Sequence, residues 1–201
     1  MRRITLIFAV LAILSFSAFT LAELLPIGSE MPKADLKMMD VSGKEISMKD
    51  AVKENGVLVM FSCNTCPYVV KNQKRTITIS DFAKKMKVGV IVLNSNEAYR
   101  SGDDSFEAMK TYAKEQKYNF NYVVDKNHEV ADAFGANRTP ESFFFDKNLK
   151  LVYHGAIDDN PSDEKAVNHE HLKNAIQSVA AGKEIAVKET KSVGCTIKRN
   201  K

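Results

Sequence analysis

The stretch that decides the fold reads Val57-Leu58-Val59-Met60-Phe61-Ser62-Cys63-Asn64-Thr65-Cys66-Pro67. Its first five residues form a continuous apolar run, which is typical of a central strand buried on both faces. A Cys-x-x-Cys pair placed between such a strand and a helix indicates redox chemistry. Pro67 favours a helix at this point, because the first helical turn tolerates a residue that has no N–H group.

The expected helix assigns a different role to each cysteine. We expect the helix to begin at Cys63, so that its unpaired N–H groups and the positive end of its dipole stabilise that thiolate. Cys63 is then the nucleophile that attacks a substrate disulfide. Cys66, one turn deeper and less open to solvent, is expected to be the resolving thiol that releases the mixed disulfide by exchange.

Two other interpretations of the Cys63/Cys66 pair, a zinc site and a structural disulfide, have less support than the redox role. A zinc site needs four ligands, and only Cys195 and a histidine are left to complete it. A purely structural disulfide across two intervening residues constrains the unfolded chain little and so adds little stability. His169 and His171, two positions apart on a predicted helix, should point to different sides and make a poor ligand pair. We therefore expect neither a metal nor another cofactor.

The N-terminus predicts export. Arg2 and Arg3 precede an apolar run, and Thr20-Leu21-Ala22 ends in small residues, so residues 1–22 are typical of a cleaved signal peptide. An uncleaved membrane anchor is the alternative, and a membrane partner is expected only in that case. Export to the periplasm or the exterior would place the cysteines where disulfides persist. Residues 23–201 are long enough for one domain, with a basic tail from about Lys183.

The charge balance gives no sign of a nucleic-acid partner. Loss of Arg2 and Arg3 with the signal lowers Lys and Arg from 29 to 27 against 25 Asp and Glu, so the formal charge falls from +4 to +2. The only basic cluster, Lys191 to Lys201, lacks interleaved aromatic residues. We expect this tail to be a mobile, solvated end.

Hydrophobic patterns and turn residues predict strands that alternate with helices and end in a hairpin plus a helix. This order predicts an α/β fold with a mixed central sheet, helices on both faces and an N-terminal hairpin. The predicted strands are Leu36 to Met39, Glu45 to Ser47, Val57 to Phe61, Val88 to Leu93, Asn121 to Val124, Ser142 to Phe145 and Leu149 to His154. The predicted helices are a short one between the capping box Ser47 to Asp50 and Asn55-Gly56, the redox helix with a break near Ser80, Ser105 to Lys117, His128 to Phe134 and His171 to Ala181.

With these pieces in place, the chain resembles the thioredoxin-fold proteins of the redoxin class, which include exported thiol-disulfide oxidoreductases and peroxiredoxin-like proteins. The resemblance rests on the strand with its Cys-x-x-Cys-Pro, on Arg138-Thr139-Pro140 before an apolar strand, and on the stretch Leu151 to Asp159. It implies that Pro140 is a cis proline facing the cysteines. It also implies that Thr139 lies beside Cys63 and offers its backbone to an extended substrate segment by β-strand addition. An ordinary trans turn at Pro140 is the alternative.

The chain departs from this class at two places. Many thioredoxins carry a carboxylate in the strand before the cysteines as the proton acceptor for the resolving thiol, and residues 57–62 contain none. Glu141 or a water are the open candidates. Cys195 is an extra thiol in the tail, and we expect it either to fold back and exchange with Cys63 and Cys66, to pair between chains, or to stay a free accessory thiol.

The motifs and the resemblance together lead to three alternative predictions of the function. The leading prediction is an exported thiol-disulfide oxidoreductase that acts on protein disulfides or dithiols with an unidentified electron donor or acceptor. The second is a peroxiredoxin-like thiol peroxidase with an antioxidant role, against which Met60 stands where the peroxiredoxin signature has Thr or Ser. The third is a Sco-like copper-delivery protein, whose cysteines would be spaced by three residues instead of two.

Overall fold

The computed structural model describes residues 23–200, so the predicted signal peptide, residues 1–22, lies outside the described residues. The strands are β1 (Met38–Met39), β2 (Glu45–Ile46), β3 (Val57–Ser62), β4 (Gly89–Asn94), β5 (Asn121–Val124), β6 (Arg138–Thr139), β7 (Glu141–Phe145), β8 (Leu151–Gly155) and β9 (Cys195–Thr196). The α-helices are α1 (Pro67–Lys85), α2 (Phe106–Glu115), α3 (Glu129–Phe134) and α4 (His171–Ala180). Short 3-10 turns cover Lys49–Ala51, Glu97–Tyr99, Lys126–His128 and Glu164–Ala166.

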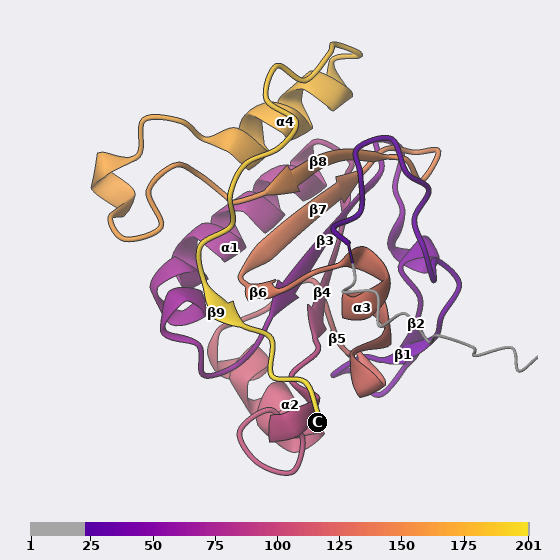
Figure 1. The fold of residues 1–201 in the computed structure, drawn as a ribbon, viewed down its shortest axis with the longest axis vertical. Coiled ribbons are helices and arrows are strands. Elements are labelled where there is room, and N and C mark those ends of the chain that lie inside the picture. Colours follow the sequence, from indigo (N-terminus) through magenta and orange to yellow (C-terminus); the bar gives the residue numbers. More distant parts are fainter. Residues whose placement is uncertain (1–22, 201) are drawn as a thin grey trace, which may run out of the picture.

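The central sheet has five strands in the order β5-β4-β3-β7-β8 (Figure 1). β3 pairs in parallel with β4, and β4 with β5, whereas β7 is antiparallel to both β3 and β8. All six residues of β3 are buried, as expected for the middle strand of a sheet covered on both faces. The predicted central strand and mixed sheet are confirmed.

Alternation along β3 divides the core into two layers. Val57, Val59 and Phe61 join a cluster that includes α3 and the N-terminal segment. Leu58 and Met60 join the cluster on the opposite face, where α1, α2 and α4 pack. Helices therefore cover both faces of the sheet, and the predicted fold class is confirmed.

Local signals placed most of the other elements correctly. The predicted N-terminal hairpin is present as β1 and β2, and β7 with β8 forms the second one. The capping box is reciprocal: the N–H of Ser47 donates to Asp50 Oδ2 (2.8 Å), and the N–H of Asp50 donates to Ser47 Oγ (3.2 Å). The helix after it is shorter than predicted and ends at Ala51.

Two predictions for the redox helix are wrong. The helix begins at Pro67, with Cys66 as its N-cap, instead of at Cys63. It also runs unbroken past Ser80, whose hydroxyl donates to the carbonyl of Thr76 (2.7 Å). Thr76 and Ile79 are buried on the face that packs toward the core. Burial of that face outweighs the weak helix propensity of the β-branched residues.

The predicted solvated tail is exposed over much of its length, but the expectation is wrong where β9 and Ile197 pack against the body. After α4 the chain returns across the molecule, and β9 lies beside β6 in Figure 1. Ile197 is buried in the core cluster that includes α3. The tail thus contributes one apolar residue to the core, although its overall composition is basic. Within the part of the chain that the structure describes, no helix is long and apolar enough to span a bilayer.

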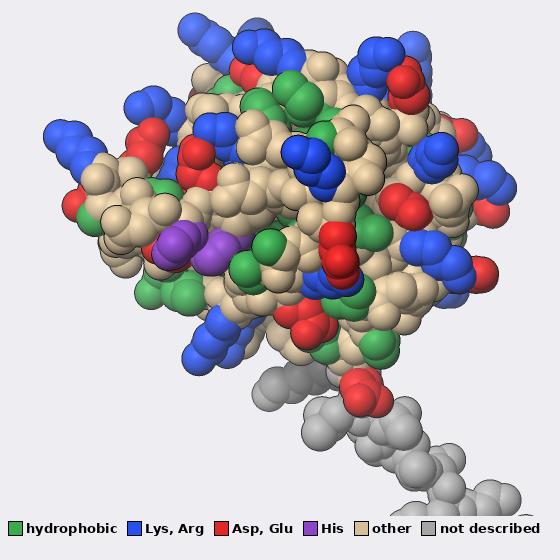
Figure 2. Space-filling model, turned by 90° about the horizontal axis from the view of Figure 1, so that it is seen from above, with side chains coloured by type: hydrophobic (Ala, Val, Ile, Leu, Met, Phe, Trp, Pro, Cys, Tyr) green, Lys and Arg blue, Asp and Glu red, His purple; other side chains and the backbone are tan. Residues whose placement is uncertain are grey.

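Figure 2 shows Lys and Arg side chains interspersed with Asp and Glu over the face that it draws. The rings of His169 and His171 stack with centroids 5.9 Å apart. The expectation that these side chains point to different sides is therefore wrong, because α4 begins only at His171 and His169 lies in the preceding loop.

Candidate active site

The two cysteines lie where β3 ends and α1 begins, opposite the segment that carries Thr139 and Pro140. The Thr139-Pro140 peptide bond is cis, as the resemblance implied. Thr139 Oγ1 lies 3.6 Å from Cys63 Sγ, and Cys66 Sγ donates to the carbonyl of Thr139 at 3.2 Å. Thr139 therefore contacts both sulfurs, one through its side chain and one through its backbone.

Both cysteines are buried: Cys63 is 2% exposed and Cys66 is 4% exposed. The expectation that Cys63 is the more open of the two is wrong for this conformation. The reason is that β9 lies against β6 beside the pair, with Cys195 packed against the small cluster of Cys63, Cys66 and Val69. All three cysteines are free thiols in the structure.

The two neighbouring sulfurs shift each other's pKa in opposite directions. A hydrogen bond from the Cys63 thiol, and further ones from the N–H of Val69 and from Cys195, lower the pKa of Cys66. The same thiol pairing, together with burial, raises the pKa of Cys63, and the Thr139 hydroxyl opposes this rise. While β9 lies beside the pair, Cys66 is therefore the more acidic of the two thiols, because it is the helix N-cap and collects the larger number of donors.

Asp104, which no sequence motif singled out, organises the loop between the cysteines. Its carboxylate is fully buried. It accepts hydrogen bonds from the N–H of Asn64 (2.9 Å) and from the side-chain amides of Asn94 (2.7 Å) and Asn96 (2.9 Å). The residue follows Asp103 in a turn-rich segment that reads as ordinary loop, so the sequence carried no signal for this role.

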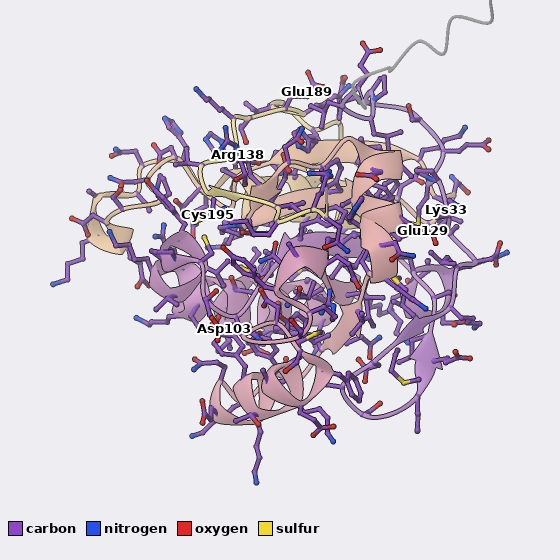
Figure 3. All side chains as sticks on the ribbon, turned by 60° about the horizontal axis from the view of Figure 1, so that its bottom comes forward. Lys33, Asp103, Glu129, Arg138, Glu189 and Cys195 are labelled. Carbon is purple, nitrogen blue, oxygen red and sulfur yellow. The ribbon has the colours of Figure 1, made fainter. Side chains whose placement is uncertain are left out.

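Asn64 is held from its other side as well. Its side-chain amide donates to the carbonyl of Asp103 (2.7 Å), and its side-chain oxygen accepts from the hydroxyl of Tyr122 (2.8 Å). Figure 3 labels Asp103, whose carbonyl accepts the first of these bonds. These bonds hold residues 64–65 as a bend. Cys66, which precedes Pro67, is extended, so the helix begins after it.

Glu141, one of the open candidates for the proton acceptor of Cys66, holds the cis-proline segment instead. Glu141 Oε2 accepts from the backbone N–H groups of Asn137 (2.8 Å) and Arg138 (3.0 Å). Its other oxygen lies 3.0 Å from Nε2 of the buried His154. One oxygen therefore positions the residues before Thr139, and the other contacts His154 on β8.

Cys195 folds back on the pair, as one of the three sequence-based alternatives expected. In the β6–β9 ladder, Cys195 stands opposite Thr139 and Thr196 opposite Arg138. Burial raises the pKa of the Cys195 thiol, and its hydrogen bond to Cys66 and the charge there add to the rise. Figure 3 shows Cys195 on the yellow tail strand. In residues 23–200, no three His, Cys, Asp or Glu side chains gather in a way that could hold a metal ion.

The chain was compared with protein-family models, with characterised proteins and with solved structures. The Redoxin family model matches residues 26–170. The thiol-disulfide oxidoreductase ResA of Bacillus thuringiensis subsp. konkukian is 28% identical over 134 residues, which are 67% of this chain and 72% of that protein. A crystal structure of an uncharacterized conserved protein from Geobacillus kaustophilus superimposes with a TM-score of 0.81 at 32% identity, over 87% of this chain and 93% of the other. A hypothetical protein of Sinorhizobium meliloti 1021 superimposes with a TM-score of 0.80 at 28% identity, over 89% of this chain and 97% of the other.

Proposed function

The chain belongs to the Redoxin family, and on that premise we propose that it is a thiol-disulfide oxidoreductase that acts on protein disulfides or dithiols through Cys63 and Cys66. The observation that carries the proposal is the contact of Thr139 with both sulfurs, next to a strand edge on which an extended chain already lies. The similarity to ResA supports the same chemistry.

In the reducing direction, Cys63 attacks a substrate disulfide and forms a mixed disulfide, and the second substrate sulfur leaves as a thiolate. Cys66 then attacks Cys63 Sγ. The Cys63–Cys66 disulfide forms, the mixed disulfide breaks, and the substrate leaves with both sulfurs reduced. Thr139 and Pro140 dock the substrate segment by backbone pairing, in the position that β9 occupies in the closed chain.

We assign the attack to Cys63 although Cys66 is the more acidic thiol while β9 lies beside the pair. The donors that Cys195 directs at Cys66 leave with β9 when a substrate takes its place. Two donors remain for a Cys63 thiolate, the hydroxyl of Thr139 and the N–H of Cys66. Cys66, as the N-cap within the first turn of α1, is held in place for the resolving step.

Export to the periplasm or the exterior is part of the proposal. Its support is the pattern of residues 1–22: two arginines, an apolar run and small residues before Glu23. An oxidising compartment would supply disulfide substrates.

Insulin-disulfide reduction by the mature chain, residues 23–201, tests the proposed function. Wild type should catalyse the reduction with dithiothreitol as the electron source, and Cys63→Ser and Cys66→Ser should lose that catalysis. Peroxide consumption, followed in parallel by stopped flow, should be no faster than that of a free thiol. Rapid peroxide consumption without insulin reduction would replace the proposal with a thiol peroxidase.

A further inference from the structure

The segment after α4 is fastened to the body of the protein at two places on either side of the cysteine pair. At the first, the N–H of His154 donates to the carbonyl of Lys188 (2.9 Å), and the N–H of Thr190 donates to the carbonyl of His154 (3.0 Å). The N–H of Ala156 also donates to Thr190 Oγ1 (3.0 Å). The tail thus runs along the edge of β8 before it reaches the active site.

The second fastening lies beyond the active site. The N–H of Ile197 donates to the carbonyl of Asn137 (3.0 Å), and the N–H of Lys198 donates to Asn96 Oδ1 (2.8 Å). The Arg199 guanidinium donates to Asp132 Oδ1 and to the carbonyl of Ala136, both at 2.7 Å. Residues 191–196 are therefore held from both ends across the edge of β6 (Arg138–Thr139), the docking edge at which a substrate segment would pair.

Between these fastenings the tail approaches the cis-proline segment more closely than most residues would allow. A Cβ atom on Gly194 would lie 2.2 Å from the carbonyl oxygen of Thr139, so only glycine fits there. The next residue, Cys195, is the β-ladder partner of Thr139. Its side chain packs against the cluster that Cys63, Cys66 and Val69 form and interacts with Cys66, whereas the side chain of Thr196 is exposed. The tail is thus bound as an extended substrate segment would be, with a cysteine at the reacting position.

We propose that Cys195 is a third redox residue, which forms a disulfide with Cys66 in place of Cys63. This bond holds the tail covalently over the edge of β6, where a substrate segment would pair. The inference rests on the proposed function, because that function supplies the Cys63–Cys66 disulfide. The Cys195 thiolate attacks Cys66 Sγ, the Cys66–Cys195 bond forms, and the Cys63–Cys66 bond breaks. Cys63 leaves as a thiolate and takes the proton that Cys195 gave up. No electrons are gained or lost, and no external oxidant is needed.

This exchange gives the oxidised protein two forms. In one, the disulfide joins Cys63 and Cys66 and the tail is free to leave β6. In the other, the disulfide joins Cys66 and Cys195, Cys63 is a free thiol, and β9 stays on the edge where a substrate would pair. The covalently closed form would keep a second substrate away until a dithiol reductant attacks the Cys66–Cys195 bond.

Peptide mapping of the oxidised full-length mature protein tests the inference. The protein is equilibrated in glutathione redox buffers, quenched with acid, blocked with N-ethylmaleimide and digested with trypsin. Cys63 and Cys66 share the peptide 54–71, and Cys195 lies in the peptide 192–198. We expect these two peptides to be disulfide-linked within one chain, with N-ethylmaleimide on Cys63. Cys195 carrying N-ethylmaleimide in every buffer, while Cys63 and Cys66 are oxidised, would overturn the inference.

Variants separate this inference from the proposed function. Cys63→Ser cannot reduce insulin through the proposed mechanism, yet it should still form the Cys66–Cys195 link on oxidation with diamide. Cys66→Ser should form no comparable link between Cys63 and Cys195, and an equally rapid link there would overturn the assignment of Cys66 as the partner.

A matched control moves the thiol by one position. Cys195→Thr combined with Thr196→Cys keeps the composition and places the cysteine on the outer side of β9. The linked peptide should be lost in this variant, and far-UV circular dichroism should be unchanged. An equal yield of the link would show that a flexible tail, instead of the β6–β9 register, brings the thiols together.

Discussion

Thr139 and Cys195 are antiparallel partners in the short β6–β9 ladder, and the side chain of Thr139 lies 3.6 Å from Cys63 Sγ. One residue thus pairs with the tail through its backbone and faces the cysteine pair through its hydroxyl. Substrate docking and closure of the tail compete for the same strand edge, and the competition leads to the first prediction.

Replacing Gly194 by alanine should open the tail. The added Cβ would lie 2.2 Å from the carbonyl oxygen of Thr139, so β9 must shift away from β6. A clash of this kind costs about 1 to 3 kcal/mol, and 1.4 kcal/mol corresponds to about a tenfold change in population. Alkylation of the reduced Cys63/Cys66 pair by iodoacetamide should therefore become about tenfold faster. Gly102→Ala is the matched control, because the nearest atom to a Cβ there is 4.0 Å away. Equal rates in both variants would mean that β9 does not cover the pair.

Thr139→Val should make Cys63 less acidic. The Thr139 hydroxyl lowers the pKa of Cys63 by hydrogen bonding, and valine keeps the shape while removing that donor. A net hydrogen bond to a charged group is worth about 1.5 kcal/mol or more, which corresponds to about one pKa unit. The pH profile of Cys63 alkylation, measured in the Cys66→Ser background, should shift upward by about that amount. Thr139→Ser keeps the hydroxyl and should restore the original profile.

Asp104→Asn should lower the stability of the protein and make the Cys63 thiol more acidic. The asparagine amide places a donor where one oxygen now accepts from the N–H of Asn64 or from the amides of Asn94 and Asn96, which leaves a buried donor unpaired. Urea unfolding should show a loss of about 1 to 3 kcal/mol. The charge of Asp104 raises the pKa of Cys63, so its removal should lower that pKa. Asp103→Asn, at the exposed neighbour, is the control. A stable variant with an unchanged alkylation profile would refute the assigned role of Asp104.

The exchange from the Cys63–Cys66 to the Cys66–Cys195 disulfide should accelerate with pH. Burial, the largest cause of the raised pKa of Cys195, persists in the oxidised protein, although the charge on Cys66 does not. Lys198 opposes the rise. The attacking species is the thiolate, so the rate should increase about tenfold per pH unit below that pKa and continue to rise beyond pH 8.5, the usual value of a free cysteine. Acid-quenched time courses measure this rate, and a plateau below pH 8 would contradict the prediction.

The sequence predicted the sheet and most of the helices, because periodic burial and turn residues are local signals. The central run 57–61, the hairpin around residues 146–148 and the glycine that ends α3 all follow from such signals. The cis bond at Pro140 and the contact of Thr139 with Cys63 followed from the resemblance and are confirmed.

The features that the sequence did not reveal depend on contacts between distant residues. The bend at Asn64, which precedes α1, is held by Asp104, 40 positions further along the chain. The order of the tail comes from backbone hydrogen bonds to Asn137 and His154 and from burial of Ile197 among residues of α3. Composition alone described this tail as basic and solvated, because backbone pairing leaves no trace in composition.

Mixed-disulfide trapping tests the central claim most directly, since the claim is that Cys63 attacks a substrate disulfide and Cys66 resolves it. Cys66→Ser and Cys63→Ser, each in a Cys195→Ser background, are incubated with a peptide that contains a single disulfide, and the intact masses are measured. We predict a stable adduct on Cys63 in the chain that carries Cys66→Ser, and at least about tenfold less adduct in the chain that carries Cys63→Ser, a ratio that corresponds to about 1.4 kcal/mol. A dominant adduct on Cys66, or no adduct on either thiol, would contradict the account.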